Sequence, residues 1–137
     1  MHLSAILSAH HLRNTKPRQA VFAALQRAAA PLTISHLIAQ CSTIDRTSIY
    51  RTLQLFTRHG IVSVVPIGWK RAYELAEPFM PHHHHLQCTR CRRLIDIQTP
   101  ELEQLIAAIS QRHHFQPTDH HFEINGFCRS CQHSTTN

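Results

Sequence analysis

The sequence predicts an α+β fold in two parts: an N-terminal domain of three helices and a β-hairpin, and a smaller C-terminal α/β domain. Helix-spaced apolar residues recur three times before residue 60, and β-branched or alternating segments follow up to residue 75. After residue 82, two CxxC pairs enclose a strand–helix–strand pattern. Because 137 residues divided in this way give two small cores, we expect the parts to need extra stabilisation.

The helices of the N-terminal domain have recognisable ends. Pro17 suits a first helical turn, and we expect this helix to run on to Pro31. Thr33 and Asp45 are suitable N-caps for the second and third helices. Gly60 is placed to end the third helix, because glycine readily adopts the left-handed backbone that follows a helix.

A β-hairpin is predicted after these helices. Residues 61–67 are rich in β-branched side chains, Gly68 and Trp69 provide a two-residue turn, and residues 70–75 alternate like a returning strand. Three helices followed by a hairpin is the element order of a winged helix-turn-helix domain, which we assign to residues 1–75.

Prolines mark the boundary between the domains. Pro78 and Pro81 interrupt any regular element, so we place a linker at residues 76–81 and the second domain at residues 82–137.

The second domain is predicted to hold a strand at residues 94–97, a helix that starts with Thr99 as its cap, and a strand at residues 122–125. An edge strand of so small a sheet can pair with a second copy. This domain therefore predicts a homodimer.

Positive charge is concentrated in the first part of the chain. The net charge is +6; residues 1–81 contain nine Lys or Arg against three Asp or Glu, and residues 82–137 contain five of each. The excess favours a polyanionic partner, with a merely solvated basic surface as the alternative. No stretch approaches the ~20 apolar residues of a membrane span, and the start lacks a signal-peptide pattern, so we expect a cytoplasmic protein without membrane contact.

The two CxxC pairs predict a structural zinc site, whose ligands are Cys88, Cys91, Cys128 and Cys131. Four thiolates leave no open position on Zn²⁺, and the metal would fold a domain too small to hold itself. Disulfides or redox chemistry are the alternatives, and a reducing compartment disfavours the former. Cys41, outside the pairs, is predicted to be a buried core residue.

Four consecutive histidines precede the first cysteine pair, at residues 82–85. On a strand, the first and third would face one side and the second and fourth the other, so one run can supply two metal sites. Candidate further ligands are Glu74, Glu77, Asp96, Glu103 and His120. Mixed nitrogen and oxygen ligands suit exchangeable Fe²⁺, Zn²⁺ or Mn²⁺. An expression tag also contains such a run, although a tag is normally terminal.

Together these features resemble the ferric uptake regulator (Fur) family of bacterial metal-dependent transcriptional repressors. The resemblance covers about residues 5–132 and is carried by the strings Thr15-Lys16-Pro17-Arg18, Thr47-Ser48-Ile49-Tyr50-Arg51-Thr52-Leu53, Tyr73-Glu74-Leu75, His82-His83-His84-His85-Leu86-Gln87-Cys88 and Asn125-Gly126-Phe127-Cys128. It implies a winged-helix DNA-binding domain, a zinc-containing dimerisation domain, and control of metal homeostasis genes at a double-stranded DNA operator.

In this family the helix with the Ser-Ile-Tyr-Arg string enters the major groove. The resemblance therefore implies that Ser48, Tyr50 and Arg51 face DNA, with Tyr50 against bases and Arg51 against base or phosphate. Lys16 and Arg18 would lie at the backbone or the minor groove. An ordinary exposed position on an amphipathic helix is the alternative for Tyr50.

The resemblance also assigns the two histidine sets. A regulatory site between the domains would use Glu74, His83, His85 and Asp96. A second site within the dimerisation domain would use His82, His84, Glu103 and His120. Glu77 is the alternative to Glu74, because two extra residues separate the Tyr-Glu-Leu string from the histidines.

Two positions depart from the family pattern. Pro31 stands where the family often supplies a histidine to the regulatory site, so that site would have fewer ligands, use water, or recruit His10, His11 or His36. The peroxide-sensing branch oxidises the missing histidine, so an iron-, zinc- or manganese-responsive regulator is favoured over a peroxide sensor. Arg92 replaces the glycine usual after the second cysteine.

Two other classes of function fit the sequence less well. A zinc hydrolase or deaminase needs an open metal position beside a general base, and the sequence has neither HExxH nor HxE followed by PCxxC. A metal-storage or metal-delivery protein does not require a basic helix-turn-helix half. We therefore predict a regulator that is not an enzyme.

Overall fold

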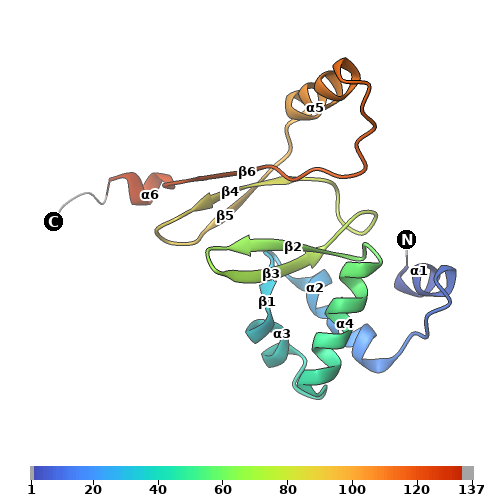
Figure 1. Cartoon of the computed structure of the whole chain (residues 1–137). Helices are drawn as coiled ribbons and strands as arrows, with labels where there is room; N and C mark the ends of the chain where they lie inside the picture. The colour runs from blue at the N-terminus through green and yellow to red at the C-terminus, as the bar shows by residue number, and fades with distance from the viewer. Residues whose placement is uncertain (1, 134–137) are drawn as a thin grey trace. The chain divides into compact units, whose positions relative to one another are not determined.

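The computed structural model describes residues 2–133, which form two compact units divided between Pro81 and His82 (Figure 1). Each unit has a three-stranded sheet of its own. Among residues 2–133, no helix is both long enough and apolar enough to cross a bilayer.

The N-terminal unit contains the three predicted helices and the hairpin in the predicted order, together with a further helix before them and a short strand between the first two of them. Its helices are α1 (Leu3–Ala9), α2 (Lys16–Arg27), α3 (Ile34–Gln40) and α4 (Arg46–Arg58). Its antiparallel sheet has the order β1 (Leu32–Thr33), β3 (Lys70–Leu75), β2 (Val62–Ile67). Strands β2 and β3 form the predicted hairpin, which is closed by the pair Ile67 and Lys70.

The core of this unit is made by apolar side chains from all four helices and the hairpin. The largest fully buried side chains are Phe56, Leu7, Leu37, Ile49, Ile61 and Val21. Cys41 is also buried, as predicted, and burial raises the pKa of its thiol. Phe79 and Met80, within the segment predicted as a linker, pack against the same core.

Local signals set the ends of α3 and α4. The Asp45 carboxylate accepts a hydrogen bond from the Ser48 backbone N–H at 2.9 Å, which confirms the predicted cap. Hydrogen bonding from the Ser48 side chain, and then from its backbone N–H, lowers the pKa of Asp45. Thr33 caps α3 in the same way, through the backbone N–H of His36. Gly60 follows α4 with a φ of +64°, as predicted.

The predicted end of α2 is wrong. The helix ends at Arg27, four residues before Pro31, and Ala28 is already extended. The physical reason is tertiary: the intervening residues must carry the chain to β1, where Leu32 pairs with Tyr73 of β3.

The C-terminal unit confirms the predicted strand–helix–strand pattern. Its central strand is β4 (His84–Cys88), with β5 (Leu94–Ile97) antiparallel on one side and β6 (Glu123–Gly126) parallel on the other. Helix α5 (Pro100–Arg112) connects the two outer strands, and the short α6 (Arg129–Gln132) follows β6 (Figure 1). The histidine run therefore leads into the centre of this sheet.

Thr99 occupies the predicted N-cap position of α5, but its hydroxyl does not cap the helix. Its backbone carbonyl accepts hydrogen bonds from the N–H groups of Leu102 and Glu103 instead. The hydroxyl is buried without a hydrogen-bond partner among residues 2–133, so the predicted side-chain cap is wrong.

Candidate metal centres and DNA-binding surface

Strand register brings the two cysteine pairs together. Cys88 is the last residue of β4 and lies opposite Gly126 of the parallel strand β6, two residues before Cys128. The Thr89 backbone N–H donates to the Gly126 carbonyl at 2.8 Å, which continues the pairing beyond the strand. The two CxxC loops therefore leave the sheet side by side.

The spacing of the four sulfurs fits a tetrahedral metal ion and not a disulfide. All four Sγ atoms lie within 4.8 Å of one another, and the Cys91 and Cys128 sulfurs are 3.7 Å apart. A disulfide would join its sulfurs at about 2.05 Å. Zinc–sulfur bonds of about 2.3 Å place tetrahedral sulfurs about 3.8 Å apart. The cluster is therefore suited to a structural Zn²⁺ ion.

Backbone amides favour anionic sulfur in this cluster. The N–H groups of Cys128 and Cys91 donate to Cys88 Sγ at 3.4 and 3.5 Å and lower the pKa of Cys88 to about 5. The backbone N–H of Cys131 lowers the pKa of Cys128. Burial, together with hydrogen bonds to neighbouring sulfurs, raises the pKa of Cys131 to about 12. Coordination to a metal ion would deprotonate that last thiol.

Two arginines, one inside the first CxxC loop and one just after it, have features that only the structure shows. The Arg90 guanidinium donates to the Cys131 carbonyl at 3.0 Å and lies 5.5 Å from the centre of the Phe127 ring, so it links the two loops. The sequence analysis did not single out Arg90, although its position between Cys88 and Cys91 places it beside the predicted zinc site. Arg92 has a φ of +64°, the left-handed conformation that glycine adopts most easily. That conformation accounts for the glycine that the family resemblance leads us to expect at this position.

A second cluster lies on one side of β4 and contains the predicted residues His82, His84, Glu103 and His120. The register of β4 and β6 explains why His82 and His120 lie close together. His85 pairs with Glu123 of β6, so the residues three positions earlier, His82 and His120, also come opposite one another. Glu103 is in the first turn of α5, which begins just after the strand partner of His84.

The donor atoms of this second cluster are close enough to share one ion. Glu103 Oε1 lies 2.8 Å from His84 Nε2, 3.3 Å from His120 Nε2 and 3.4 Å from His82 Nε2. Metal–nitrogen bonds of about 2.05 Å place tetrahedral ligand atoms about 3.3 Å apart. The hydrogen bond from His84, followed by the one from His120, lowers the pKa of Glu103. The set offers three imidazole nitrogens and one carboxylate.

His83 and His85 form a separate pair, as the alternation of a strand predicts. Their ring centres are 4.8 Å apart, and His85 Nε2 lies 3.5 Å from Oδ1 of Asp96, its partner across β4 and β5. Glu74 lies on β3 of the N-terminal unit, opposite Ser63, and Glu77 lies in the turn that follows this strand. That either glutamate joins His83 and His85 at one ion remains a prediction.

The residues predicted to face DNA lie at the starts of α2 and α4. Tyr50 and Arg51 are exposed on α4, whose opposite face is buried in the core. Ser48 is partly buried, and its backbone N–H is used by the Asp45 cap. Lys16 and Arg18 are in the first turn of α2.

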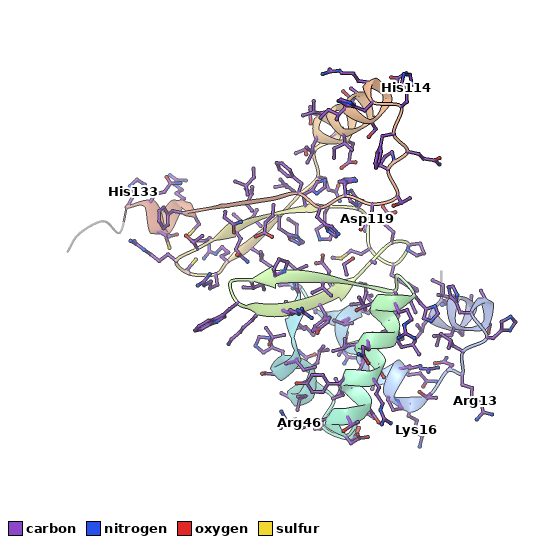
Figure 2. All side chains as sticks on the ribbon, viewed as in Figure 1. Arg13, Lys16, Arg46, His114, Asp119 and His133 are labelled. Carbon is purple, nitrogen blue, oxygen red and sulfur yellow. The ribbon has the colours of Figure 1, made fainter. Side chains whose placement is uncertain are left out.

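Further basic residues extend this surface. Arg13, Lys16 and Arg46 are labelled in Figure 2 near the ends where α2 and α4 begin. Arg18 donates from its guanidinium to the carbonyl of Arg13, which holds the segment before α2 against the helix. Arg13 and Arg46 were not singled out from the sequence, although both lie beside predicted DNA-facing residues.

The chain is similar to known proteins over nearly its whole length. Residues 9–125 match the family model described as the ferric uptake regulator family. The ferric uptake regulation protein of Synechococcus elongatus is 30% identical over 139 residues, which cover 96% of this chain and 94% of that protein. The chain belongs to the ferric uptake regulator family.

Solved structures of the ferric uptake regulator family share this fold. The Helicobacter pylori ferric uptake regulator matches with a TM-score of 0.80 at 24% identity, covering 99% of this chain and 97% of that chain. The Pseudomonas aeruginosa regulator with manganese matches with a TM-score of 0.83 at 20% identity, covering 94% and 99% of the two chains. The predicted fold class is confirmed, and by family this chain is a metal-responsive transcriptional repressor.

Proposed function

We propose that this regulator binds operator DNA as a homodimer when an exchangeable divalent metal ion occupies its histidine sites. The observation that carries the proposal is the separation of ligand types in the C-terminal unit. Four thiols form one closed cluster, whereas the histidine run divides between two sets of nitrogen and oxygen donors. Four thiolates suit permanent structural zinc, and mixed donors bind metal more reversibly, as a sensor requires.

The regulatory ion would be held by His83, His85 and Asp96 together with Glu74 of the winged domain. A bound ion supplies the positive charge that holds carboxylates and imidazoles from both domains. Ligands from both domains would favour one arrangement of the two winged domains in a dimer, so metal affinity and DNA affinity would be coupled reciprocally. The ion at His82, His84, Glu103 and His120 would support the dimerisation domain. The Helicobacter pylori regulator is described as having three functional metal binding sites, which supports three sites here.

The winged domain would read DNA through α4. The N-terminal turns of a recognition helix contact base edges, which suits Tyr50 and Arg51, and the basic residues Lys16 and Arg18 suit phosphate or minor-groove contacts. A DNA target together with five cysteines that form no disulfide bond also fits a reducing, cytoplasmic location.

The homodimer is supported by the exposed apolar side chains of the C-terminal unit. Helix α5 has apolar residues at helical spacing, yet none of its residues is buried, and Leu105 and Ile109 are about half exposed. Ile95, Phe115, Phe122, Ile124 and Phe127 are exposed in the same unit. So many exposed apolar side chains in a small unit indicate an interface, and a second copy would cover them.

The test is a DNA-binding titration in which only the exchangeable metal is varied. The DNA used in the titration is a duplex obtained beforehand, by selecting the sequences that the metal-loaded protein binds from a pool of randomised duplexes. A chelator removes exchangeable metal, and metal analysis verifies that one zinc ion per chain remains. We expect affinity to fall at least tenfold and to recover with Fe²⁺, Zn²⁺ or Mn²⁺. Because Zn²⁺ binds most nitrogen and oxygen sites more tightly than Fe²⁺ or Mn²⁺, the sensed metal is the ion whose activating concentration matches its free concentration in the cell.

Unchanged affinity after this chelation would contradict metal sensing. His85→Ala should abolish the metal response while leaving the zinc content intact. His113→Ala is the matched control, because His113 is an exposed histidine that follows α5 and belongs to neither metal set.

A further inference from the structure

Two histidines of the N-terminal unit have rings in contact although they lie far apart in the sequence. The ring centres of His10 and His59 are 4.5 Å apart, and the rings are inclined at 52°. Within the two histidine sets of the C-terminal unit, the ring centres in contact are 4.7 to 5.2 Å apart. The pair therefore has nearly the ring spacing of the predicted metal ligands, but it belongs to neither set.

This spacing is also the one that a shared metal ion requires. Metal–nitrogen bonds of about 2.05 Å place two imidazole ring centres about 4.5 Å apart when the bonds meet at a right angle, and about 5.2 Å apart when they meet at the tetrahedral angle. Each neutral imidazole offers one nitrogen lone pair to a metal. One ion can therefore bind both rings with little movement of their centres.

The backbone holds the two rings at corresponding places. His10 follows α1 and His59 follows α4 with almost the same backbone angles, φ −98° and ψ 12° for His10 and φ −99° and ψ 13° for His59. The His10 N–H donates to the Leu7 carbonyl at 3.2 Å, and the His59 N–H donates to the Leu55 carbonyl at 3.1 Å. Leu3 and Leu7 are buried in the core, and α1 lies beside the end of α4 that leads into β2 (Figure 1). Both rings are therefore mounted on elements that the core positions.

Two helices end at this pair, and their ends favour a cation. The last carbonyl groups of a helix carry partial negative charge, whose effect is confined to the last turn. Arg58 precedes His59 and opposes a second cation, but its side chain is exposed, so water and salt screen its charge. His10 is exposed and His59 is half-buried, so an ion can enter from solvent and water can complete its coordination.

We propose that His10 and His59 form a further metal site, which binds a divalent transition-metal ion between the ends of α1 and α4. Imidazole nitrogen suits Zn²⁺, Cu²⁺ and Ni²⁺. Two protein ligands hold an ion less tightly than four, so this site fills at a higher free metal concentration than the cysteine cluster and the histidine sets. The sequence offered His10 as a replacement ligand for the regulatory ion, and its contact with His59 gives it a ligand partner within its own unit instead.

An ion at this site would fasten α1 to the rest of the winged domain. The helix has seven residues, too few for a helix to be stable by itself. An ion that binds only while the two rings are together lowers the population of the detached helix, by about tenfold when the free ion is at ten times its dissociation constant. Detachment of α1 would therefore depend on the metal concentration.

Hydrogen exchange of α1 in the full chain measures this effect. The chain is first loaded with Zn²⁺ at its cysteine cluster and histidine sets, free Zn²⁺ is then raised further, and equilibrium dialysis counts the bound ions. We expect one further ion per chain. At ten times its dissociation constant, exchange in α1 should be about tenfold slower, whereas exchange in α2 should not change.

Substitutions test whether both rings hold the ion. His10→Ala and His59→Ala should each remove the further ion and the slower exchange, and the double variant should lose no more than either single variant, because a chelated ion needs both rings. His10→Gln should behave like His10→Ala, since glutamine keeps a polar side chain without an imidazole nitrogen. His113→Ala is the matched control, because His113 is exposed and lies outside the pair and both sets, and it should retain the further ion.

The outcomes are distinguishable. Exchange in α1 that does not respond to Zn²⁺ would overturn the site, and so would loss of the further ion from only one of the two single alanine variants. Loss of the α1 response in His85→Ala would assign His10 to the regulatory ion and also overturn it. Metal-independent DNA binding with the α1 response intact would overturn the proposed function and leave this site standing.

Discussion

In the N-terminal unit, buried apolar residues run from Leu3 to Leu75, whereas in the C-terminal unit Cys88 is the one buried hydrophobic residue among those described. The other buried residues of the second unit are polar: His84, His85 and Gln87. The first unit is therefore stabilised by its own hydrophobic core. The second has little core and depends on metal ligands and, in our proposal, on a partner subunit.

The largest effect that would test this contrast is loss of the cysteine cluster. Cys128→Ser should release zinc and unfold the C-terminal unit, because a domain that depends on its metal is unfolded without it. Hydrogen exchange should show lost protection in β4 and β6 and unchanged protection in α2 and α4. Cys41→Ser is the control, since this buried cysteine lies outside the cluster. Retained protection in β4 would show that the unit has a sufficient core.

The reverse experiment breaks the N-terminal core. Phe56 is fully buried, so Phe56→Ala should cost about 3–5 kcal/mol of the free energy of unfolding of this unit. Denaturant titration followed by circular dichroism measures the loss, and the zinc content should not change. Tyr50→Ala, an aromatic truncation at an exposed position of the same helix, should change stability by only about 0.5 kcal/mol. Equal losses in the two variants would contradict the contrast.

A smaller effect is expected at the apolar face of α5. Ile109→Glu places a charge among exposed apolar residues and should weaken the proposed dimer by about 2–3 kcal/mol, because Ile109 is 46% exposed and its burial gains about half of the roughly 1.5–3 kcal/mol of a whole isoleucine in each of two subunits. Sedimentation velocity over a range of concentrations measures the dissociation constant. Gln111→Glu adds the same charge at an exposed polar position of α5 and should leave the dimer intact.

The smallest effect concerns the backbone of the zinc loop. Arg92→Gly should stabilise the C-terminal unit by about 1 kcal/mol, since the left-handed conformation costs a non-glycine residue about that much. Arg93→Gly should instead destabilise it, because Arg93 is not in the left-handed region and glycine adds freedom to the unfolded chain. Thermal unfolding of the zinc-loaded protein compares the two variants. A lower melting temperature for Arg92→Gly would show that the arginine side chain contributes more than the strain costs.

Features with local causes were predictable. Asp45 caps α4 because its carboxylate reaches a backbone N–H three residues away, and Gly60 ends the helix because of its own backbone freedom. Features with distant causes were not. The end of α2 depends on where β1 must pair with β3. The Thr99 hydroxyl forms no cap because the backbone conformation before α5 does not direct it to the first turn of the helix.

The sequence by itself determined the metal-binding groups: four cysteines at CxxC spacing, a four-histidine run, and the acids and histidine that could complete its sites. Only the tertiary structure decided which of these groups meet. His84 and Glu103 are 19 residues apart, and His82 and His120 are 38 apart, yet each pair is in contact at 2.8 and 3.0 Å. Strand register and the start of α5 create these contacts, and spacing along the chain does not encode them, because coordination requires ligand atoms within a few ångströms in space.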